Sequence, residues 1–328
     1  MGKFLLRRFI NYLILVSLAA CVGYLLAASS LNPRNNFEGR NPPPPKAAVD
    51  RLLDDLNLND ETPIGERFGT WVSGVVTADF GKTVSNDPIW PEMKRRMGVS
   101  LRLLLIGSLI GVTGGVIAGV VCAVRQYRLA DNFITLTSFL MLSTPVFFLA
   151  IMLKFGARQV NDAFSPEVLL YYTGETSPTA GSGFWTGMVD RIKHLILPTL
   201  AIVLGQVAAY SRYQRSTMLD VLGSDFLRTA RAKGLRYRKA LFKHGLRTAV
   251  IPLTTFFAYG FTLLITGAAF TEKLFGWHGM GEWFIDSVRR NDVNVVAAVV
   301  VFSAILILIA GMIADLAHAA LDPRVRAR

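Results

Sequence analysis

The sequence predicts an all-α polytopic membrane protein, and three observations lead to that class. Of the 328 residues, 52% are hydrophobic. They are grouped in blocks of roughly twenty, about the length of a helix that crosses the hydrocarbon core of a bilayer. The blocks are continuously apolar, without the period-two alternation of a membrane β-barrel, and lipid offers no partner to an unpaired backbone. Six blocks are expected to span the membrane: Phe9–Leu31, Val99–Val124, Asp131–Phe155, His194–Ser211, Ala249–Phe270 and Val293–Ala314.

The placement of lysine and arginine predicts that both termini lie in the cytoplasm. With that orientation the inner segments are rich in bases and poor in acids, whereas the outer segment 32–98 has nearly balanced charge, which is the positive-inside pattern. The inner bases are Lys3, Arg7, Arg8, Arg125, Arg128, those between Arg212 and Arg247, and Arg324, Arg326 and Arg328. The net charge of +12 is therefore interpreted as a topology signal, and nucleic-acid binding is not expected.

The first span is expected to remain uncleaved, because its apolar run is long for a signal peptide. The outer segment that follows is expected to form a small lobe. A proline run at Pro42–Pro45 favours extended backbone, Val49–Leu58 reads as a short amphipathic helix, and Trp71, Phe80 and Trp90 are expected to pack on the membrane surface. The predicted division is residues 1–31 for the cytoplasmic start and first span, 32–98 for the outer lobe, and 99–328 for a transmembrane domain with a cytoplasmic loop at 212–248.

Glycine and proline residues in the later spans predict helix contacts and helix bends. Gly107, Gly111, Gly115 and Gly119 recur every four residues in the second span. This spacing places them on one helix face, where a second backbone can approach closely. Pro145 falls inside the third span and is expected to kink it. Pro252 is expected near the start of a helix, where proline costs little.

The cytoplasmic loop at 212–248 contains a short helix whose ends the sequence marks. Ser224 is a candidate N-cap and Asp225 suits a first turn, whereas Lys233 and Gly234 suit a C-terminus. A helix over Asp225–Lys233 is predicted, followed by a second helix over roughly Arg236–Thr248. An isolated helix of this length is marginal, so tertiary contacts are expected to hold it.

Several chemistries are not supported by the sequence. Gly81-Lys82-Thr83 resembles the end of a phosphate-binding loop, but Val76 stands where that pattern needs glycine. The four histidines lack ligand spacing, and the two cysteines, Cys21 and Cys122, cannot form a metal site alone. No metal, no cofactor and no catalytic residue is expected. The spans also lack the mid-membrane charge that ion-coupled carriers usually keep, so the energy source is expected to lie outside this chain.

The cytoplasmic loop resembles a known coupling motif. Asp225-Phe-Leu-Arg-Thr-Ala-Arg-Ala-Lys-Gly-Leu235, followed by Lys243-His-Gly-Leu-Arg-Thr-Ala-Val-Ile-Pro252, is similar to the EAA loop of peptide permeases. Arg228 and Thr229 stand where the general importer motif has Glu and Ala, as in the peptide branch. Further similarities are Phe4–Arg8, Ser143–Phe147, Leu321–Arg326 and the outer turn Phe275–Gly281, where His278 replaces a proline. On these motifs the chain is identified as a member of the permease subunits of ATP-binding-cassette (ABC) importers for oligopeptides and dipeptides, and it is most similar to the first-subunit type of oligopeptide permease.

This resemblance implies the type I ABC importer fold in a bacterial cytoplasmic membrane. It implies a paralogous second permease, two ABC ATPase subunits that use ATP and magnesium, an external peptide-binding protein and surrounding lipid as partners. The residues implied in ATPase coupling are Asp225, Arg228, Thr229, Ala230, Arg231, Lys233 and Gly234, with Ala230 and Gly234 small enough for close approach. Gly279 and Gly281 are the implied outer-turn glycines.

Two alternatives remain open at this stage. One is an ABC importer permease for another cargo, such as nickel, glutathione or an opine, because nothing in the spans discriminates cargo. The other is a stand-alone secondary carrier, since sodium sites can be built from carbonyls and hydroxyls. Thr262 and Thr266 could line a pathway, or could equally bond their own backbone.

Overall fold

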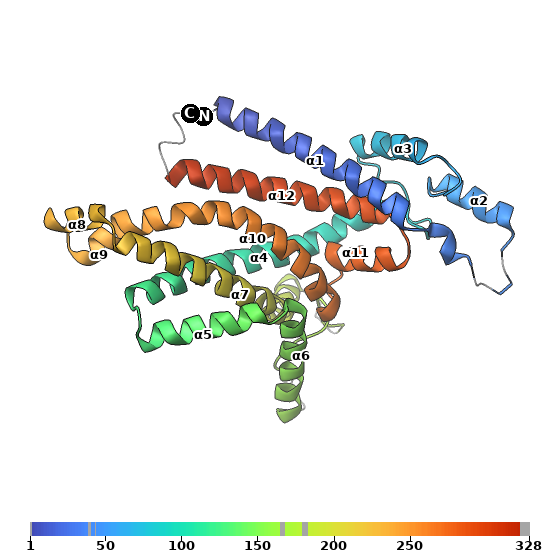
Figure 1. The fold of residues 1–328 in the computed structure, drawn as a ribbon. Coiled ribbons are helices and arrows are strands. Elements are labelled where there is room, and N and C mark those ends of the chain that lie inside the picture. Colours follow the sequence, from blue (N-terminus) through green and yellow to red (C-terminus); the bar gives the residue numbers. More distant parts are fainter. Residues whose placement is uncertain (1, 39–40, 43, 165–167, 179–182, 322–328) are drawn as a thin grey trace. The chain divides into compact units, whose positions relative to one another are not determined.

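The computed structural model describes residues 2–38, 41–42, 44–164, 168–178 and 183–321, and these residues are mostly helical (Figure 1). Within those ranges the only β-type pairing is an isolated bridge between Lys82 and Pro88. The helices are α1 Gly2–Ser30, η1 Pro33–Asn36, α2 Lys46–Asp55, α3 Ile64–Val76, α4 Ile89–Val124, α5 Leu129–Ser143, α6 Val146–Ala163, α7 Phe184–Leu222, α8 Asp225–Ala232, α9 Tyr237–Ala240, the π-helical η2 Leu241–Gly245, α10 Leu246–Phe275, α11 Met280–Arg289 and α12 Val293–Leu321.

Five of the described helices are long and apolar enough to cross a membrane, and a sixth span results if α5 and α6 are taken together. The predicted all-α membrane class is therefore confirmed. The chain divides into two compact units. One comprises Gly2–Leu101 with His278–Leu308, and the other comprises Arg102–Trp277 with the stretch from Ile309 onward.

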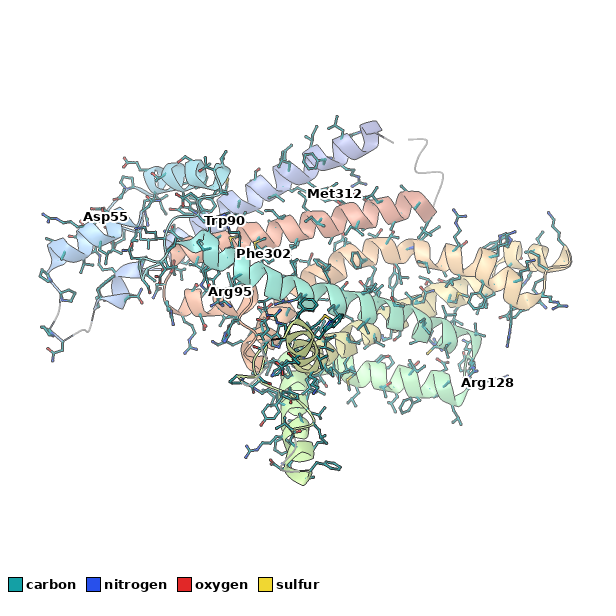
Figure 2. The ribbon with its side chains drawn as sticks, turned by 180° about the vertical axis from the view of Figure 1, so that it is seen from behind. Asp55, Trp90, Arg95, Arg128, Phe302 and Met312 are labelled. Carbon is teal, nitrogen blue, oxygen red and sulfur yellow. The ribbon has the colours of Figure 1, made fainter. Side chains whose placement is uncertain are left out.

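In the first of these units, aromatic side chains bury the contact between α1 and α3. Tyr24 of α1 is fully buried and stacks on Trp71 of α3, with 4.7 Å between the ring centroids. Phe80 stacks on Trp90 at 5.8 Å, and Figure 2 shows Trp90 and Arg95 on the first turns of α4. The expectation that Trp71 and Phe80 pack on the membrane surface is wrong, because both side chains are buried within the protein and Trp71 packs on Tyr24 of α1. The helix α3 that carries Trp71 was not predicted.

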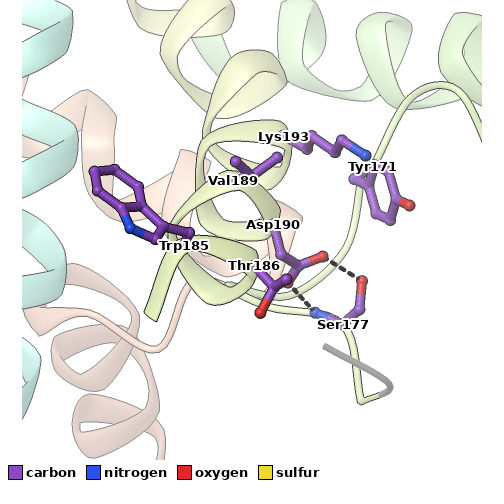
Figure 3. Close-up of a pocket in the computed structure, with 7 residues that line it drawn as sticks. All are labelled: Tyr171, Ser177, Trp185, Thr186, Val189, Asp190 and Lys193. Carbon is purple, nitrogen blue, oxygen red and sulfur yellow. Dashed lines mark hydrogen bonds between the residues drawn. The ribbon is translucent and has the colours of Figure 1, made fainter. Parts of the chain in front are cut away.

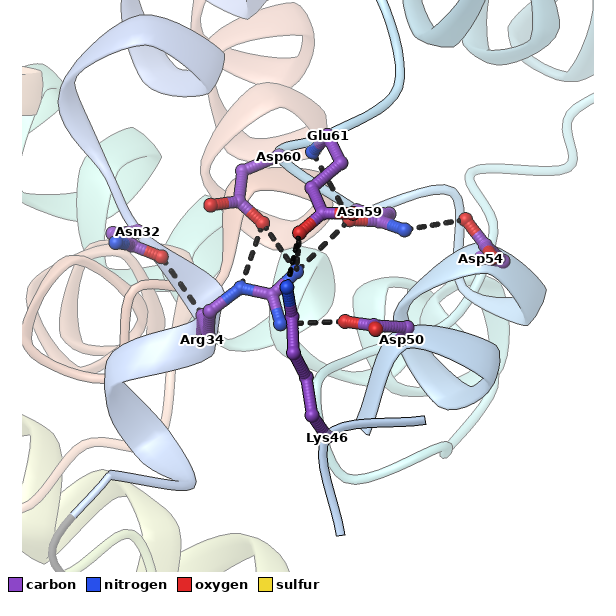
Figure 4. Close-up of polar contacts among 8 residues, drawn as sticks. All are labelled: Asn32, Arg34, Lys46, Asp50, Asp54, Asn59, Asp60 and Glu61. Carbon is purple, nitrogen blue, oxygen red and sulfur yellow. Dashed lines mark hydrogen bonds and ion pairs between the residues drawn. The ribbon is translucent and has the colours of Figure 1, made fainter. Parts of the chain in front are cut away.

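Arg34 organises the start of residues 32–98, the predicted lobe (Figure 4). Its guanidinium donates to Asp50 at 2.6 Å, to Asp60 at 2.7 Å and to the Asn59 side-chain oxygen at 3.1 Å. Hydrogen bonds from Arg34 lower the pKa of Asp60, and the paired carboxylates raise the pKa of Arg34. One cation thus ties η1 to α2 and to the loop before α3. The structure places α2 at Lys46–Asp55, three residues earlier than the predicted helix at Val49–Leu58.

The turn between α11 and α12 holds several parts of the same lobe. The Asn291 side chain accepts from the Asn32 amide, and Asp292 accepts from the Val84 amide at 2.9 Å. The Asn294 side chain donates to the carbonyls of Leu56 and Lys82. The turn therefore holds three separate segments of residues 32–84 through side-chain to backbone hydrogen bonds.

The second unit is built around α7, which packs against α5, α6 and α10. Phe256 of α10 stacks on Tyr213 of α7 at 4.6 Å and meets Tyr210 edge-on at 5.0 Å. Pro198 lies inside α7, yet the helix runs from Phe184 to Leu222 without a break.

The third predicted span is broken rather than kinked. α5 ends at Ser143, Pro145 is the N-cap of α6, and the two helices are bent by 106°. Figure 1 shows α6 running across the direction of α5. α6 then packs against α7 and α10, where a Cβ added at Gly205 or Gly267 would reach Val146 at about 4 Å. Because proline has no backbone N–H of its own and disfavours the helical conformation of the residue before it, α5 ends before Pro145 and the chain turns here.

The expected position of Pro252 is also wrong. Residues Tyr237–Phe275 form one continuous helical stretch through α9, η2 and α10, so Pro252 lies in the helix interior. The predicted second helix at Arg236–Thr248 is the first part of this stretch. Its π-helical segment η2 lies about two turns before Pro252.

Candidate functional site

The helix α8 lies between two long helices, where the sequence placed it. α7 ends at Leu222, Gly223 is its C-cap, and α8 occupies Asp225–Ala232 with Lys233 as the following cap residue. Ser224 is the N-cap residue, but its hydroxyl donates back to the Val221 carbonyl at 2.5 Å instead of capping α8. The helix therefore depends on packing for its position.

The inner face of α8 is fixed to its own subunit. Leu227 is 3% exposed and belongs to a buried cluster with Ala123 of α4, Met218 and Val221 of α7, and Ala240, Leu241 and Ala249 of the following helical stretch. Ala230 is half-buried and packs against the same cluster. Ala230 therefore contributes to packing within this chain, and it remains partly exposed.

The opposite face of α8 is open. Asp225, Arg228, Thr229, Arg231 and Lys233, together with Ala232, are all exposed. Phe226 is 44% exposed on this polar helix. Sequence reasoning missed Phe226, although a helical projection would have separated it from the inward Leu227 and Ala230. An aromatic side chain surrounded by bases is a typical composition for a protein contact surface.

Backbone geometry explains the glycine after α8. Gly234 has a φ of +89°, in the left-handed region, and a Cβ added there would meet nothing within 4 Å. The turn therefore needs glycine for its backbone conformation, and within this chain a larger residue would meet no atoms. In the next turn the Arg231 guanidinium lies 5.5 Å from the centre of the Tyr237 ring. Arg247 donates to the carbonyl of Leu321 at the end of α12, a favourable position for a cation. The rest of the Leu321–Arg326 motif lies outside the described residues.

The glycine ladder faces α7. A Cβ built on Gly111 would lie 2.5 Å from Gln206, one on Gly115 would lie 2.4 Å from Tyr210, and one on Gly119 would lie 2.6 Å from Gln214. A Cβ on Gly107 would lie 3.0 Å from Ile202. The first three distances are far inside van der Waals contact, so α4 and α7 lie closer together than any larger residue would allow. Gln214 is fully buried at this contact.

The glycines of the outer turn are ordinary in conformation. Gly279 is the N-cap of α11 and its carbonyl accepts from Arg96 at 3.3 Å, while Gly281 lies in the first turn of α11. His278, which replaces the family proline, is 2.7 Å from a Glu282 carboxylate oxygen. The glycine with a left-handed φ in this segment is Gly276, at +65°, where a Cβ would approach Gly174.

A pocket of about 450 Å³ opens beside the first turns of α7 (Figure 3). Asp190 accepts from the backbone amide and from the hydroxyl of Ser177, each at 2.7 Å. The Lys193 ammonium lies 5.7 Å from the centre of the Tyr171 ring. Trp185 and Val189 supply apolar walls. No group of three or more possible metal ligands occurs among the described residues.

The Thr262 hydroxyl donates to the Ala258 carbonyl of its own helix at 3.3 Å, and the side chain is exposed.

The helical fold and the membrane-length helices define a polytopic helical membrane protein. A family model described as binding-protein-dependent transport system inner membrane component matches residues 115–327. This chain belongs to that family, as the resemblance implied.

Curated relatives extend the similarity over the whole chain. The chain is 51% identical over 326 residues to the oligopeptide transport system permease protein OppB of Mycobacterium tuberculosis, with 99% of each chain covered. It is 35% identical to the oligopeptide permease AppB of Bacillus subtilis, covering 85% of each chain, and 31% identical to the dipeptide permease DppB of Escherichia coli, covering 84% of each.

Proposed function

We propose that this chain is one of two permease subunits of an ABC importer that carries oligopeptides or dipeptides across a bacterial cytoplasmic membrane. The observation that carries the proposal is the 51% identity to an oligopeptide permease over nearly the entire chain. Residues 1–31 supply the cytoplasmic start and first span, 32–98 the outer lobe, and 99–328 the transmembrane domain with its cytoplasmic loop at 212–248.

The chain performs no chemistry in this scheme. ATP and magnesium are used by two partner ATPases, and a second, paralogous permease completes the pathway. An external binding protein delivers the peptide. The matching family description, which names a binding-protein-dependent system, supports that last partner.

The exposed face of α8 is the surface through which an ATPase moves this subunit. Phe226 serves as the apolar anchor, and Asp225, Arg228, Thr229, Arg231 and Lys233 supply polar and charged contacts around it. Leu227 and Ala230 hold α8 on the ends of α4, α7 and α10, so a force on α8 reaches the bundle. Rigid-body switching of the bundle then alternates access to the two sides. Gly234 sets the turn that returns the chain to the membrane.

Substitutions on the exposed face test this role without disturbing the inner face. In the assembled five-component importer, Phe226→Ser and Ala232→Trp are expected to abolish peptide import and the stimulation of ATP hydrolysis by loaded binding protein. The amount of subunit in the membrane should stay unchanged, because neither residue belongs to the buried cluster. Ala163→Trp, a bulky change at an exposed alanine of α6, is the matched control and should import normally.

Normal import in both α8 variants would contradict coupling through this face. Ala230→Trp is a less selective test, since it overpacks the cluster on which α8 rests and should dislodge the helix itself. Cargo is tested separately. Cells that express all components should take up members of a defined peptide library, and cells lacking only this subunit should take up none. Uptake that is independent of the subunit would remove the peptide assignment.

A further inference from the structure

A buried ion pair joins α5 to α7 close to α8. The Arg215 guanidinium donates through Nε to one Asp131 oxygen at 2.7 Å and through Nη2 to the other at 2.9 Å. The Asp131 side chain is 3% exposed and that of Arg215 is 26% exposed. Two parallel bonds between a planar guanidinium and a carboxylate fix both the distance and the relative orientation of the helices that carry them.

Further donors complete the shell around Asp131. The Tyr127 amide donates to one carboxylate oxygen at 2.9 Å, and the Thr135 hydroxyl donates to the other at 3.2 Å. Asp131 also lies in the first turn of α5, where a negative charge is favoured by the helix dipole. The turn before α5, in which Figure 2 labels Arg128, is therefore fixed to the same carboxylate.

The contact continues along the two helices. The hydroxyls of Ser138 and Ser211 lie 3.0 Å apart, and the Arg212 guanidinium lies 4.1 Å from the centre of the Phe139 ring. We call these three pairs, Asp131–Arg215, Ser138–Ser211 and Phe139–Arg212, the α5–α7 seam. Polar pairs of this kind tolerate only one register between two helices, whereas aliphatic packing tolerates sliding.

The same helix α7 leads directly to α8. Met218 and Val221 follow Arg215 by one and two turns, and both pack in the cluster that contains Leu227 of α8. A displacement of α8 is thus transferred to the end of α7 by apolar contact. The seam then offers a route from α7 to α5, which turns into α6 at Pro145.

We propose that Asp131 and Arg215 are positioning residues that make α5 move together with α7 and α8, so that ATP-driven displacement of α8 reaches the part of the bundle that ends at Pro145. This inference rests on the proposed function, because it assumes that α8 is the element on which the ATPase acts. It adds that the seam sets how much transport each ATP hydrolysis yields.

The first experiment uses the assembled importer with Asp131→Asn. Peptide imported per ATP hydrolysed is expected to fall at least about 5-fold, in the range of measured coupling between sites, while stimulated ATP hydrolysis continues. Arg215→Gln breaks the same pair from α7 and leaves the Tyr127 and Thr135 donors on Asp131, so it is expected to lower the yield by a similar factor. The matched control is Asp162→Asn, which breaks the exposed 3.7 Å pair with Arg158 on α6 and should leave the yield unchanged.

A second measurement uses Cys122, which is buried and lines a pocket of about 380 Å³ together with Ser138, Ser211 and Arg215. In a Cys21→Ser background, modification of Cys122 by a small maleimide reports separation of the helices at the seam. Labelling should be slow in the wild type with and without trapped nucleotide. In Asp131→Asn it should be at least about 5-fold faster in one of the two states.

The outcomes separate cleanly. An unchanged yield in a correctly assembled Asp131→Asn importer overturns the inference. Loss of import and hydrolysis in the same proportion also overturns it, since the pair would then be structural only. An unchanged yield in an Arg215→Gln importer that assembles overturns it as well, and if Asp131→Asn fails to assemble, Arg215→Gln decides alone. If Phe226→Ser and Ala232→Trp leave coupling intact, the proposed function fails independently of the seam.

Discussion

At the scale of single residues, four glycines explain how closely α4 and α7 approach each other. Two carboxylates show that burial raises a carboxyl pKa, whereas pairing with a cation lowers it. The glycine ladder was visible in the sequence because its four-residue spacing is a property of any α-helix. Its partner α7 was not, because one sequence does not show which helix a small-residue face contacts.

Gly115 provides a direct test of that contact. A Cβ at this position would lie 2.4 Å from the Cβ of Tyr210, so Gly115→Ala should cost about 1–3 kcal/mol of stability through overpacking. The matched change is Gly156→Ala in α6, where nothing lies within 4 Å and the better helix former should be neutral or slightly stabilising. Thermal unfolding of the purified complex measures both. Equal melting temperatures for the two variants would contradict the close α4–α7 contact.

Asp292 makes the stability of the lobe depend on pH, with lower stability at higher pH. Burial raises the pKa of this carboxyl from 3.8 to about 6, outweighing the hydrogen bonds from the Val84 and Val295 amides and the charge of Arg290. Between pH 3.8 and about 6, the folded lobe therefore holds a proton that the unfolded chain has lost. The proton stabilises the folded lobe by about 3 kcal/mol at low pH. This stabilisation is lost as the pH rises through about 6.

Hydrogen exchange of the Val84 amide measures this effect locally. After correction for intrinsic rates, opening of the 83–88 turn should increase about 10-fold between pH 5 and pH 8, because the part of the stabilisation lost above pH 5 is about 1.4 kcal/mol. Asp292→Asn should remove most of that dependence. Asp60 is the control, because its pKa is lowered by Arg34 and it stays ionised over the whole window. Asp60→Asn should weaken the lobe equally at both pH values. A pH slope that persists in Asp292→Asn would disprove the assignment.

At the scale of elements, the short helix α8 was predicted within one residue, whereas the third span was not predicted correctly. Residues next to α8 mark both of its ends, namely Ser224 and Asp225 at the start and Gly234 after the end. Such capping residues can be recognised from the sequence alone. The break at Pro145 depends on where Val146 packs, between Gly205 and Gly267 of other helices. The helix α3 was missed because its buried side chains Arg67 and Trp71 do not form a simple apolar stripe.

The bend has a consequence for topology. α5 has 15 residues, which corresponds to about 22 Å of helix against a hydrocarbon core of about 30 Å. α6 turns away by 106°, so it is expected to run along the outer membrane boundary with Arg158 and Asp162 in contact with water.

Labelling of single cysteines tests that placement. In a background of Cys21→Ser and Cys122→Ser, Arg158→Cys should react with a membrane-impermeant maleimide added outside intact cells. Arg128→Cys, in the turn between α4 and α5, should react only after the membrane is opened. The reverse pattern would refute the predicted orientation, and protection of Arg158→Cys on both sides would place α6 inside the bilayer.

At the scale of the whole molecule, the sequence was sufficient for the class and for the family. The long apolar blocks indicate membrane spans, and the uneven placement of lysine and arginine indicates their orientation. The loop at 225–252 indicates the transport family. The exposure of Phe226 and the packing of Ala230 against the buried cluster were not predicted, because the sequence reading did not assign the two faces of α8.

The whole chain also predicts a negative biochemical result. The segment at Gly81-Lys82-Thr83 has Val76 in place of the required glycine, and Gly81 forms a turn with a φ of +78°. The purified subunit alone is expected to release phosphate from ATP no faster than buffer without protein does. Turnover that scales with the amount of this subunit, and that persists after removal of contaminating ATPases, would contradict its assignment as a non-catalytic component.

The uninterrupted length of α7 has one more consequence. Its 39 residues correspond to about 58 Å, roughly twice the hydrocarbon thickness, so a single rod carries Asp190 near one end and Met218 near the other. Thermodynamic linkage makes influence along such a rod mutual. Suppose that a solute bound near Asp190 and a protein bound near Met218 both favour the same tilt of α7. The factor by which the solute raises the affinity of that protein must then equal the factor by which the protein raises the affinity of the solute.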